Sequence, residues 1–171
     1  FLSAEDDDAD TLKPRLLAHG ADIEMITTVN SVVERQMSMS FSLEKDVDLL
    51  EKRVKEMGDV AMIIIDPITA YLGNVDSNSN NGIRGLLEPL RMLASEQNLA
   101  ILLVAHLNKA HGTDAMMRVS GSTSWVAAVR IEYLVTPDKE DKQRRMMFPI
   151  KNNLGIDDTG FACLLYTSPS P

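Results

Sequence analysis

The sequence is poor in cysteine, in aromatic residues and in positive charge, and each scarcity excludes a class of protein. The single cysteine among 171 residues, Cys163, excludes a disulfide framework or a cysteine-rich zinc site and suits the reducing cytoplasm. Aromatic residues make up 5% of the chain, so we expect an aliphatic core. A net charge of −8 excludes a general polycation for nucleic acid, but not a local basic loop. No run approaches the roughly 18 apolar residues of a membrane helix, so no membrane partner is expected.

Both ends of the chain are interpreted as cut. The first residues, FLSAEDD (1–7), read as a strand that has already begun, and no initiator Met precedes them. TSPSP (167–171) is a Ser/Pro run unlike the rest of the chain, which fits either a flexible linker or an artificial scar. We favour the scar, and we expect one partial domain over residues 1–166 that belongs to a longer protein.

Helical periodicity is clearest over residues 42–58. Their apolar residues are spaced by four, three, four and three positions and therefore share one face: Leu43, Val47, Leu50, Val54 and Met57. Ser42 is suited to cap the start of this helix, and Gly58 to end it. Weaker patterns predict three further helices. One covers residues 10–20, capped by Asp10 or Thr11 and ended by Gly20. The second covers 83–98, with Pro89 as the candidate for a kink, and the third lies near 124–130.

Two continuous apolar runs predict the central strands. VAMIIID (60–66) and LAILLVAH (99–106) do not alternate with polar residues, which is typical of strands buried on both faces of a parallel sheet. The β-branched segment 25–33 is a further predicted strand, and 131–136 and 144–152 form a predicted strand pair around a charged loop. The alternation of strands and helices favours an α/β fold with a mostly parallel central sheet and an antiparallel extension at the end.

Polar side chains follow these strands at the edge where parallel sheets bind ligands. They are Glu5, Asp6 and Asp7 after the first strand, Asp66 after the second, and His106, Asn108 and Lys109 after the third. An acid that follows a buried strand, as Asp66 does, is typical of a magnesium-holding aspartate in nucleotide hydrolysis. A neighbouring glutamate such as Glu5 is well placed to polarise an attacking water. Taken singly, Asp66 also fits a turn, Glu5 a solvated charge and His106 a near-core histidine; together they favour an α/β enzyme.

Five segments, in this order, resemble RecA-type ATPases: SAEDDDADTLKPRLLAHGAD (3–22), IIIDPITAYLG (63–73), VAHLNKA (104–110), RVSGSTSWVAAVR (118–130) and KNNLG (151–155). They are most similar to the plasmid and phage RepA-like hexameric helicases and their AAA-type relatives, and the resemblance extends from Ser3 to about Tyr166. It implies a RecA-like three-layer fold, ATP and Mg²⁺ as cofactors, single-stranded DNA as a partner, and a hexameric ring.

The resemblance also implies roles for the residues at the strand ends. Glu5 resembles the catalytic glutamate that activates the water attacking the γ-phosphate. Asp66 resembles the Walker B aspartate that holds magnesium through its water shell. His106, with Asn108 close behind it, occupies the place of the polar residue that senses the γ-phosphate and relays its loss to loops that bind DNA.

Other matching positions concern the boundary between subunits. Lys151 resembles a basic residue offered to the ATP of the neighbouring subunit, and residues 121–122 resemble a loop that faces nucleic acid or a neighbour. Ring helicases commonly carry an arginine finger two residues past that lysine, but this chain has Asn153 there. Arg118 or Arg130 is therefore expected to serve instead.

The phosphate-cradling loop G-x-x-x-x-G-K-[ST] occurs nowhere in the 171 residues. In the family it precedes the strand that ends in the catalytic glutamate, so we expect it before residue 1 and expect no useful turnover from this chain alone. The favoured function is ATP hydrolysis coupled to translocation on single-stranded DNA in plasmid or phage replication. The alternatives are a recombination or repair ATPase that forms filaments on DNA, and a non-catalytic interaction module.

The DNA-binding residues are expected in the loop 107–121, with Lys109, His111 and Arg118 as candidates. A second basic cluster, which serves as the alternative, is Lys142, Arg144 and Arg145. Three acids lie next to the second cluster and would offset its charge: Asp138, Glu140 and Asp141. The first loop is therefore the favoured DNA contact.

Overall fold

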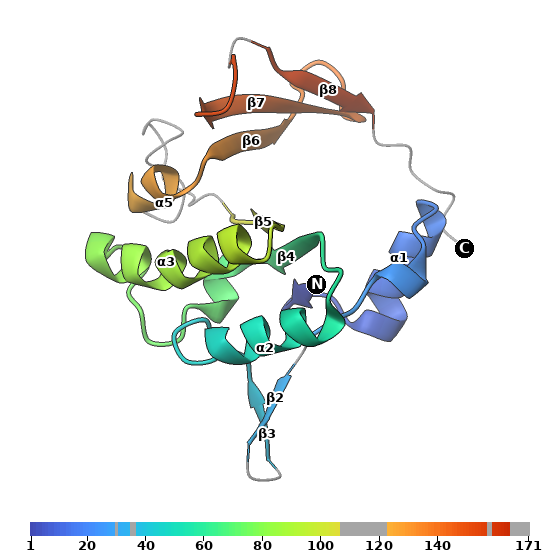
Figure 1. Cartoon of the computed structure of the whole chain (residues 1–171). Helices are drawn as coiled ribbons and strands as arrows, with labels where there is room; N and C mark the ends of the chain where they lie inside the picture. Colours follow the sequence, from blue (N-terminus) through green and yellow to red (C-terminus); the bar gives the residue numbers. More distant parts are fainter. Residues whose placement is uncertain (30, 35–36, 107–122, 157–158, 165–171) are drawn as a thin grey trace.

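The computed structural model describes residues 1–29, 31–34, 37–106, 123–156 and 159–164. These residues form a mixed α/β structure with a parallel sheet, a hairpin and a separate antiparallel sheet (Figure 1). The predicted α/β class, with a parallel sheet and an antiparallel extension, is confirmed.

The parallel sheet has the strand order β1-β4-β5. Its members are β1 (Leu2–Ser3), β4 (Met62–Asp66) and β5 (Ala100–Leu103). Ser3 lies opposite Asp66 in one ladder, and Ile65 lies opposite Leu103 in the other. Because all three strands run the same way, their carboxyl ends meet at one edge of the sheet.

The long periodic helix is confirmed as α2 (Val47–Met57), with Gly58 at its end in the left-handed conformation at φ 79°. Its start differs from the prediction. Ser42 does not cap it; instead, Ser42 N donates to Asp46 Oδ2 at 2.8 Å within a turn that precedes the helix. Of the predicted apolar face, four residues are buried and Met57 is 36% exposed at the rim.

The helix predicted at 83–98 begins three residues earlier, as α3 (Asn80–Glu96). Ser79 caps it, because Ser79 Oγ accepts a hydrogen bond from Gly82 N at 3.1 Å. The helix continues through Pro89, which lies on its exposed side. Proline there removes only the bond to the carbonyl of Gly85.

Two predictions near the start of the chain are corrected. The helix expected at 10–20 is a π-helical segment (Asp8–Leu12) followed by α1 (Lys13–Ala18). Its cap is Asp7 rather than Asp10 or Thr11, since Asp7 Oδ1 accepts from Ala9 N and Asp10 N, both at 2.9 Å.

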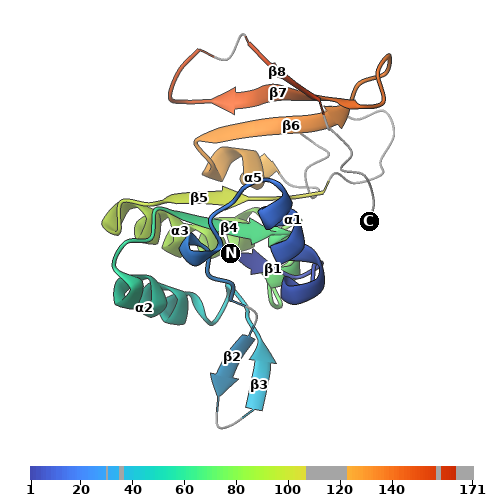
Figure 2. The same ribbon diagram turned by 90° about the vertical axis from the view of Figure 1, so that its right-hand side faces the viewer.

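The strand expected at 25–33 is wrong for residues 25–29. A 3₁₀ turn (Ile23–Met25) comes first, and residues 27–29 run beside the start of the chain through isolated bonds such as Val29 N to Phe1 O at 2.9 Å. The strand begins later, as β2 (Ser31–Glu34), and pairs antiparallel with β3 (Met37–Ser40) in a hairpin that projects from the molecule (Figures 1 and 2).

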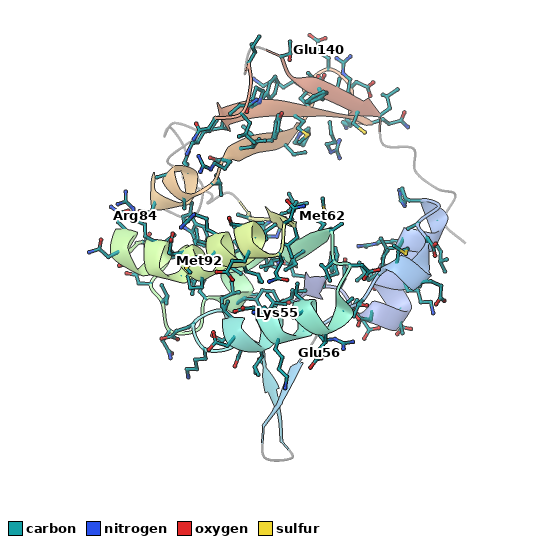
Figure 3. The ribbon with its side chains drawn as sticks, in the orientation of Figure 1. Lys55, Glu56, Met62, Arg84, Met92 and Glu140 are labelled. Carbon is teal, nitrogen blue, oxygen red and sulfur yellow. The ribbon has the colours of Figure 1, made fainter. Side chains whose placement is uncertain are left out.

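The core lies between the parallel sheet and the helices α2 and α3, and it is mainly aliphatic as expected. Its aromatic members are Phe41, Tyr71 and Trp125. The expectation that the central strands are buried on both faces is corrected for the described residues. Ile63 and Ile65 are 4% and 0% exposed, whereas Leu102 is 49% exposed on the other face. Met62, also on that face, is 54% exposed (Figure 3).

The antiparallel sheet joins β6 (Ile131–Pro137), β7 (Arg144–Asn152) and β8 (Phe161–Leu164), which confirms the predicted strand pair. A short helix, α5 (Thr123–Ala128), precedes it and packs on α3. In both views this sheet lies on the β5 side of the molecule, opposite the β2–β3 hairpin (Figures 1 and 2). Within the described part of the chain, no helix combines the length and apolarity that crossing a membrane requires.

The adjacent leucines of α2 provide a test of this packing. Leu50 is 5% exposed in the core, while Leu49 is 47% exposed. We expect Leu50→Ala to lower the free energy of unfolding by about 2–5 kcal/mol, and Leu49→Ala to change it by less than about 0.5 kcal/mol. Urea unfolding followed by the fluorescence of the single tryptophan, Trp125, measures both; equal effects would contradict the orientation of α2.

Candidate functional site

The candidate site lies where the three parallel strands end. Backbone hydrogen bonds fix this edge: Ala4 N donates to Asp66 O at 3.0 Å, and Val104 N donates to Ile65 O at 2.9 Å. Beyond the strand, Ile68 N donates to Val104 O at 2.8 Å. The residues that follow β1, β4 and β5 are therefore held side by side by main-chain bonds.

Two of the predicted side chains meet directly at this edge. His106 Nε2 lies 3.3 Å from Glu5 Oε1, and the two side chains are 66% and 60% exposed. They come from chain segments about 100 residues apart, and only the strand order brings them together. The pair is open to solvent, so Glu5 can reach a water molecule while His106 orients its carboxylate.

Asp66 completes the group from the middle strand, and it is partly buried. Burial raises the pKa of its carboxyl above the ordinary value, the negative charges of Glu5 and Asp6 raise this pKa further, and His106 acts in the opposite sense. The pKa of Asp66 therefore depends on the charges of Glu5 and His106. The structure brings together the three residues that the sequence predicted at the strand ends.

The other acids after β1 have structural partners. Asp6 Oδ2 accepts from Arg15 Nη1 at 2.8 Å, Asp7 caps the helical segment that follows, and Asp8 Oδ2 accepts from Thr28 Oγ1 at 2.7 Å. These contacts tie Asp6, Asp7 and Asp8 to neighbouring segments. Glu5 is the acid of this run that faces the end of β5.

The donor set at this edge fits magnesium. Carboxylate oxygens are the protein ligands that Mg²⁺ prefers, and the ion usually keeps several waters and binds substrate phosphates with only one or two carboxylates. A cation beside Asp66 would also offset the repulsion from Glu5 and Asp6 that raises the pKa of its carboxyl. Within the described ranges, no group of three or more His, Cys, Asp or Glu side chains is arranged to hold a metal by itself. Asp66 would thus hold the ion together with water and phosphate.

The segment after Asp66 is attached to the start of α2. A 3₁₀ turn (Ile68–Tyr71) follows the cis Asp66–Pro67 bond, and Leu43 N donates to Tyr71 O at 2.8 Å. Gly73 has a φ of 66°, and a Cβ on it would lie 2.6 Å from the side chains of Ser42 and Glu44. Another residue here would adopt a strained φ and would displace the side chains of Ser42 and Glu44.

Lys151 is bound within its own chain. Its Nζ donates to Val126 O at 2.8 Å and to Ala127 O at 3.2 Å. These carbonyls belong to the last turn of α5, so the ammonium stabilises the negative end of that helix. Its action on a neighbouring subunit stays a prediction.

Arg130 and Asn153 lie together, since Asn153 N donates to Arg130 O at 3.0 Å. Both line a pocket with Arg84 and Arg91 of α3. Arg84 and Arg91 were not among the predicted site residues. Their helical pattern was visible, but the docking of α5 on α3 was not.

The remaining predicted residues divide into two groups. Asn108, Lys109, His111, Arg118 and the loop residues 121–122 lie outside the described residues, so their roles stay predictions. Of the alternative DNA cluster, Arg144 is paired with Asp138 through Nε at 2.6 Å, and Arg145 Nη1 donates to Lys142 O at 2.7 Å. The pairing of Arg144 agrees with the expected offset by neighbouring acids.

The raised pKa of Asp66 predicts a cost in stability that depends on pH. A folded-state pKa above the unfolded value of about 3.9 destabilises the fold at pH 7, and this cost disappears as the pH falls below the unfolded pKa. We therefore expect Asp66→Asn to raise the melting temperature at pH 7, with a gain that shrinks toward pH 4. The exposed Asp59→Asn serves as the control, measured by thermal unfolding across this pH range. A lower melting temperature for Asp66→Asn at pH 7 would contradict the assigned electrostatics.

Comparison with known proteins identifies a family. The model of the AAA domain family matches residues 1–112, which include β1, β4, β5 and all three residues of the strand-end group. A search of curated proteins finds no match. Members of this family are nucleotide-dependent ATPases that generally bind ATP with Mg²⁺. The chain belongs to the AAA domain family of P-loop ATPases.

Proposed function

We propose that the chain carries the water-activating and magnesium-holding residues of an ATP-driven motor that moves on single-stranded DNA. The motor would be of the RepA-like hexameric helicase type and would act in plasmid or phage replication. The observation that supports the ATPase part is the convergence of Glu5, Asp66 and His106 on one sheet edge. The helicase part rests on the order of the resembling segments along the sequence.

Each residue has a role that its position permits. Glu5 is exposed and orients an attacking water, because its carboxylate faces solvent beside His106. Asp66 holds Mg²⁺ through the water shell of the ion, which supplies charge neutralisation on the phosphates when bound. His106 links the water-activating glutamate to the end of β5, from which the chain continues into the loop proposed to contact DNA.

The phosphates themselves need groups that this sequence does not contain. No G-x-x-x-x-G-K-[ST] loop is present in the 171 residues, and such a loop provides the backbone nest and the lysine that hold the phosphates. Tests of turnover therefore use a protein in which a phosphate loop of this kind precedes residue 1.

In that protein, Glu5→Gln should lower ATP turnover by at least about 10²-fold, because the water loses its general base. Binding of ATP should change little, since an amide replaces the carboxylate without a change of size. Steady-state hydrolysis and equilibrium ATP binding measure the two effects, with Glu24→Gln, an exposed glutamate, as the control. Near-normal turnover of Glu5→Gln would overturn the assignment.

The proposed ring predicts complementation between subunits. Rings that mix Lys151→Ala and Glu5→Gln subunits should regain part of the ATPase activity, because some interfaces then join an intact Glu5 to an intact Lys151. If Lys151 acts only by holding α5 in its own subunit, mixed rings stay as inactive as either parent. Unwinding of a forked DNA substrate by the unmodified ring tests the helicase part separately.

A further inference from the structure

A pocket of about 340 Å³ lies between α3, the end of α5, the two residues that precede β6 and the turn after β7. Its volume is within the range of small-ligand sites. It shares no residue with the strand-end group of Glu5, Asp66 and His106. Figure 3 shows Arg84 on α3 beside α5, where it forms part of the wall.

Among the described residues, the charged side chains that line this pocket are three arginines and one glutamate: Arg84, Arg91, Arg130 and Glu88. The lining is thus positive in a chain whose net charge is −8. Glu88 is already engaged, since Arg91 Nε donates to its Oε2 at 2.9 Å and a second bond joins the same two side chains. Within the described part of the chain, neither Arg84 nor Arg130 forms an ion pair, so both guanidinium groups are available to a ligand.

Neighbouring contacts hold the walls of the pocket in place. Ser124 Oγ donates to Asn80 Oδ1 at 2.7 Å, and Trp125 Nε1 to Ser77 O at 3.4 Å, which anchors α5 at the start of α3. The bond from Asn153 N to Arg130 O fixes the backbone of Arg130. The two free arginines therefore come from separate elements whose spacing is set by the fold.

Lys151 offsets the partial negative charge at the end of α5, which would otherwise repel an anion in the pocket. The carboxyl end of a helix carries partial negative charge on its last carbonyls, and the end of α5 forms part of the pocket wall. The ammonium of Lys151 binds two of these carbonyls, those of Val126 and Ala127. The ammonium thereby offsets the partial negative charge of the helix end.

We propose that this pocket binds phosphate, held between the guanidinium groups of Arg84 and Arg130. A guanidinium group offers a planar pair of donors that matches two phosphate oxygens. Phosphate has enough oxygens to accept a bidentate pair of bonds from each of two such groups, whereas a single carboxylate offers one such pair of oxygens. The same chemistry is offered by a free phosphate compound and by the backbone of a nucleic acid strand.

Binding measurements on the chain test the proposal with two probes, inorganic pyrophosphate and an oligothymidylate without terminal phosphate. Arg84→Ala and Arg130→Ala should each weaken binding of at least one probe by about tenfold or more, since each removes a charge-assisted contact. Arg53→Ala is the matched control, because it removes the same charge from an exposed site on α2. Circular dichroism establishes that each variant is folded.

The outcomes separate the sources of phosphate. If the two pocket variants lose only pyrophosphate binding, the ligand is a free phosphate compound. If they lose oligothymidylate binding, the ligand is the backbone of a nucleic acid. Both support the proposal. Equal affinity for malonate, a dicarboxylate, would overturn the phosphate assignment. So would the absence of binding of either probe, or an effect of Arg53→Ala equal to that of the two pocket variants.

Discussion

The parallel pairing of β4 with β1 and β5 is the constraint on which the candidate site depends. The register that sets Ser3 opposite Asp66 and Ile65 opposite Leu103 places three strand ends at one edge. A shift by one residue in either ladder would place side chains that now share a face on opposite faces of the sheet. The contact between Glu5 and His106 depends on this register, because the two residues lie far apart in the sequence.

Maintaining that edge requires acidic side chains to lie closer together than is favourable for stability. Asp66 is partly buried beside Glu5 and Asp6, and both raise the pKa of its carboxyl. The neighbouring acids have local partners that limit this cost, such as the bond from Arg15 to Asp6. A group of acids kept together against their repulsion is typical of a functional site rather than of a site selected for stability.

The sequence predicted best those features that depend on local pattern. The 3.6-residue period and Gly58 were sufficient for α2, and the apolar runs were sufficient for β4 and β5. The start of this predicted strand, residues 25–29, was mispredicted because its β-branched residues favour strands, whereas residues 27–29 lie beside residue 1 without a ladder. The exposure of Met62 and Leu102 was not predictable either, since a continuous apolar run does not show what covers each face.

The same distinction applies to the candidate site. Glu5, Asp66 and His106 were predictable because the carboxyl ends of parallel strands must converge. The pocket of Arg84 and Arg130 was not, because it arises from the docking of α5 on α3 through Ser124 and Trp125. Long-range docking of this kind leaves no periodic signal in either helix.

The attachment of the segment after Asp66 to α2 has a mechanical consequence. Tyr71 O accepts from Leu43 N, Asn74 N donates to Glu44 Oε2 at 3.0 Å, and Gly73 packs without clearance against the same turn. The short segment from Asp66 to Asn74 is therefore attached at its far end to the turn that precedes α2. We therefore expect a displacement of the end of β4 to move the turn that precedes α2.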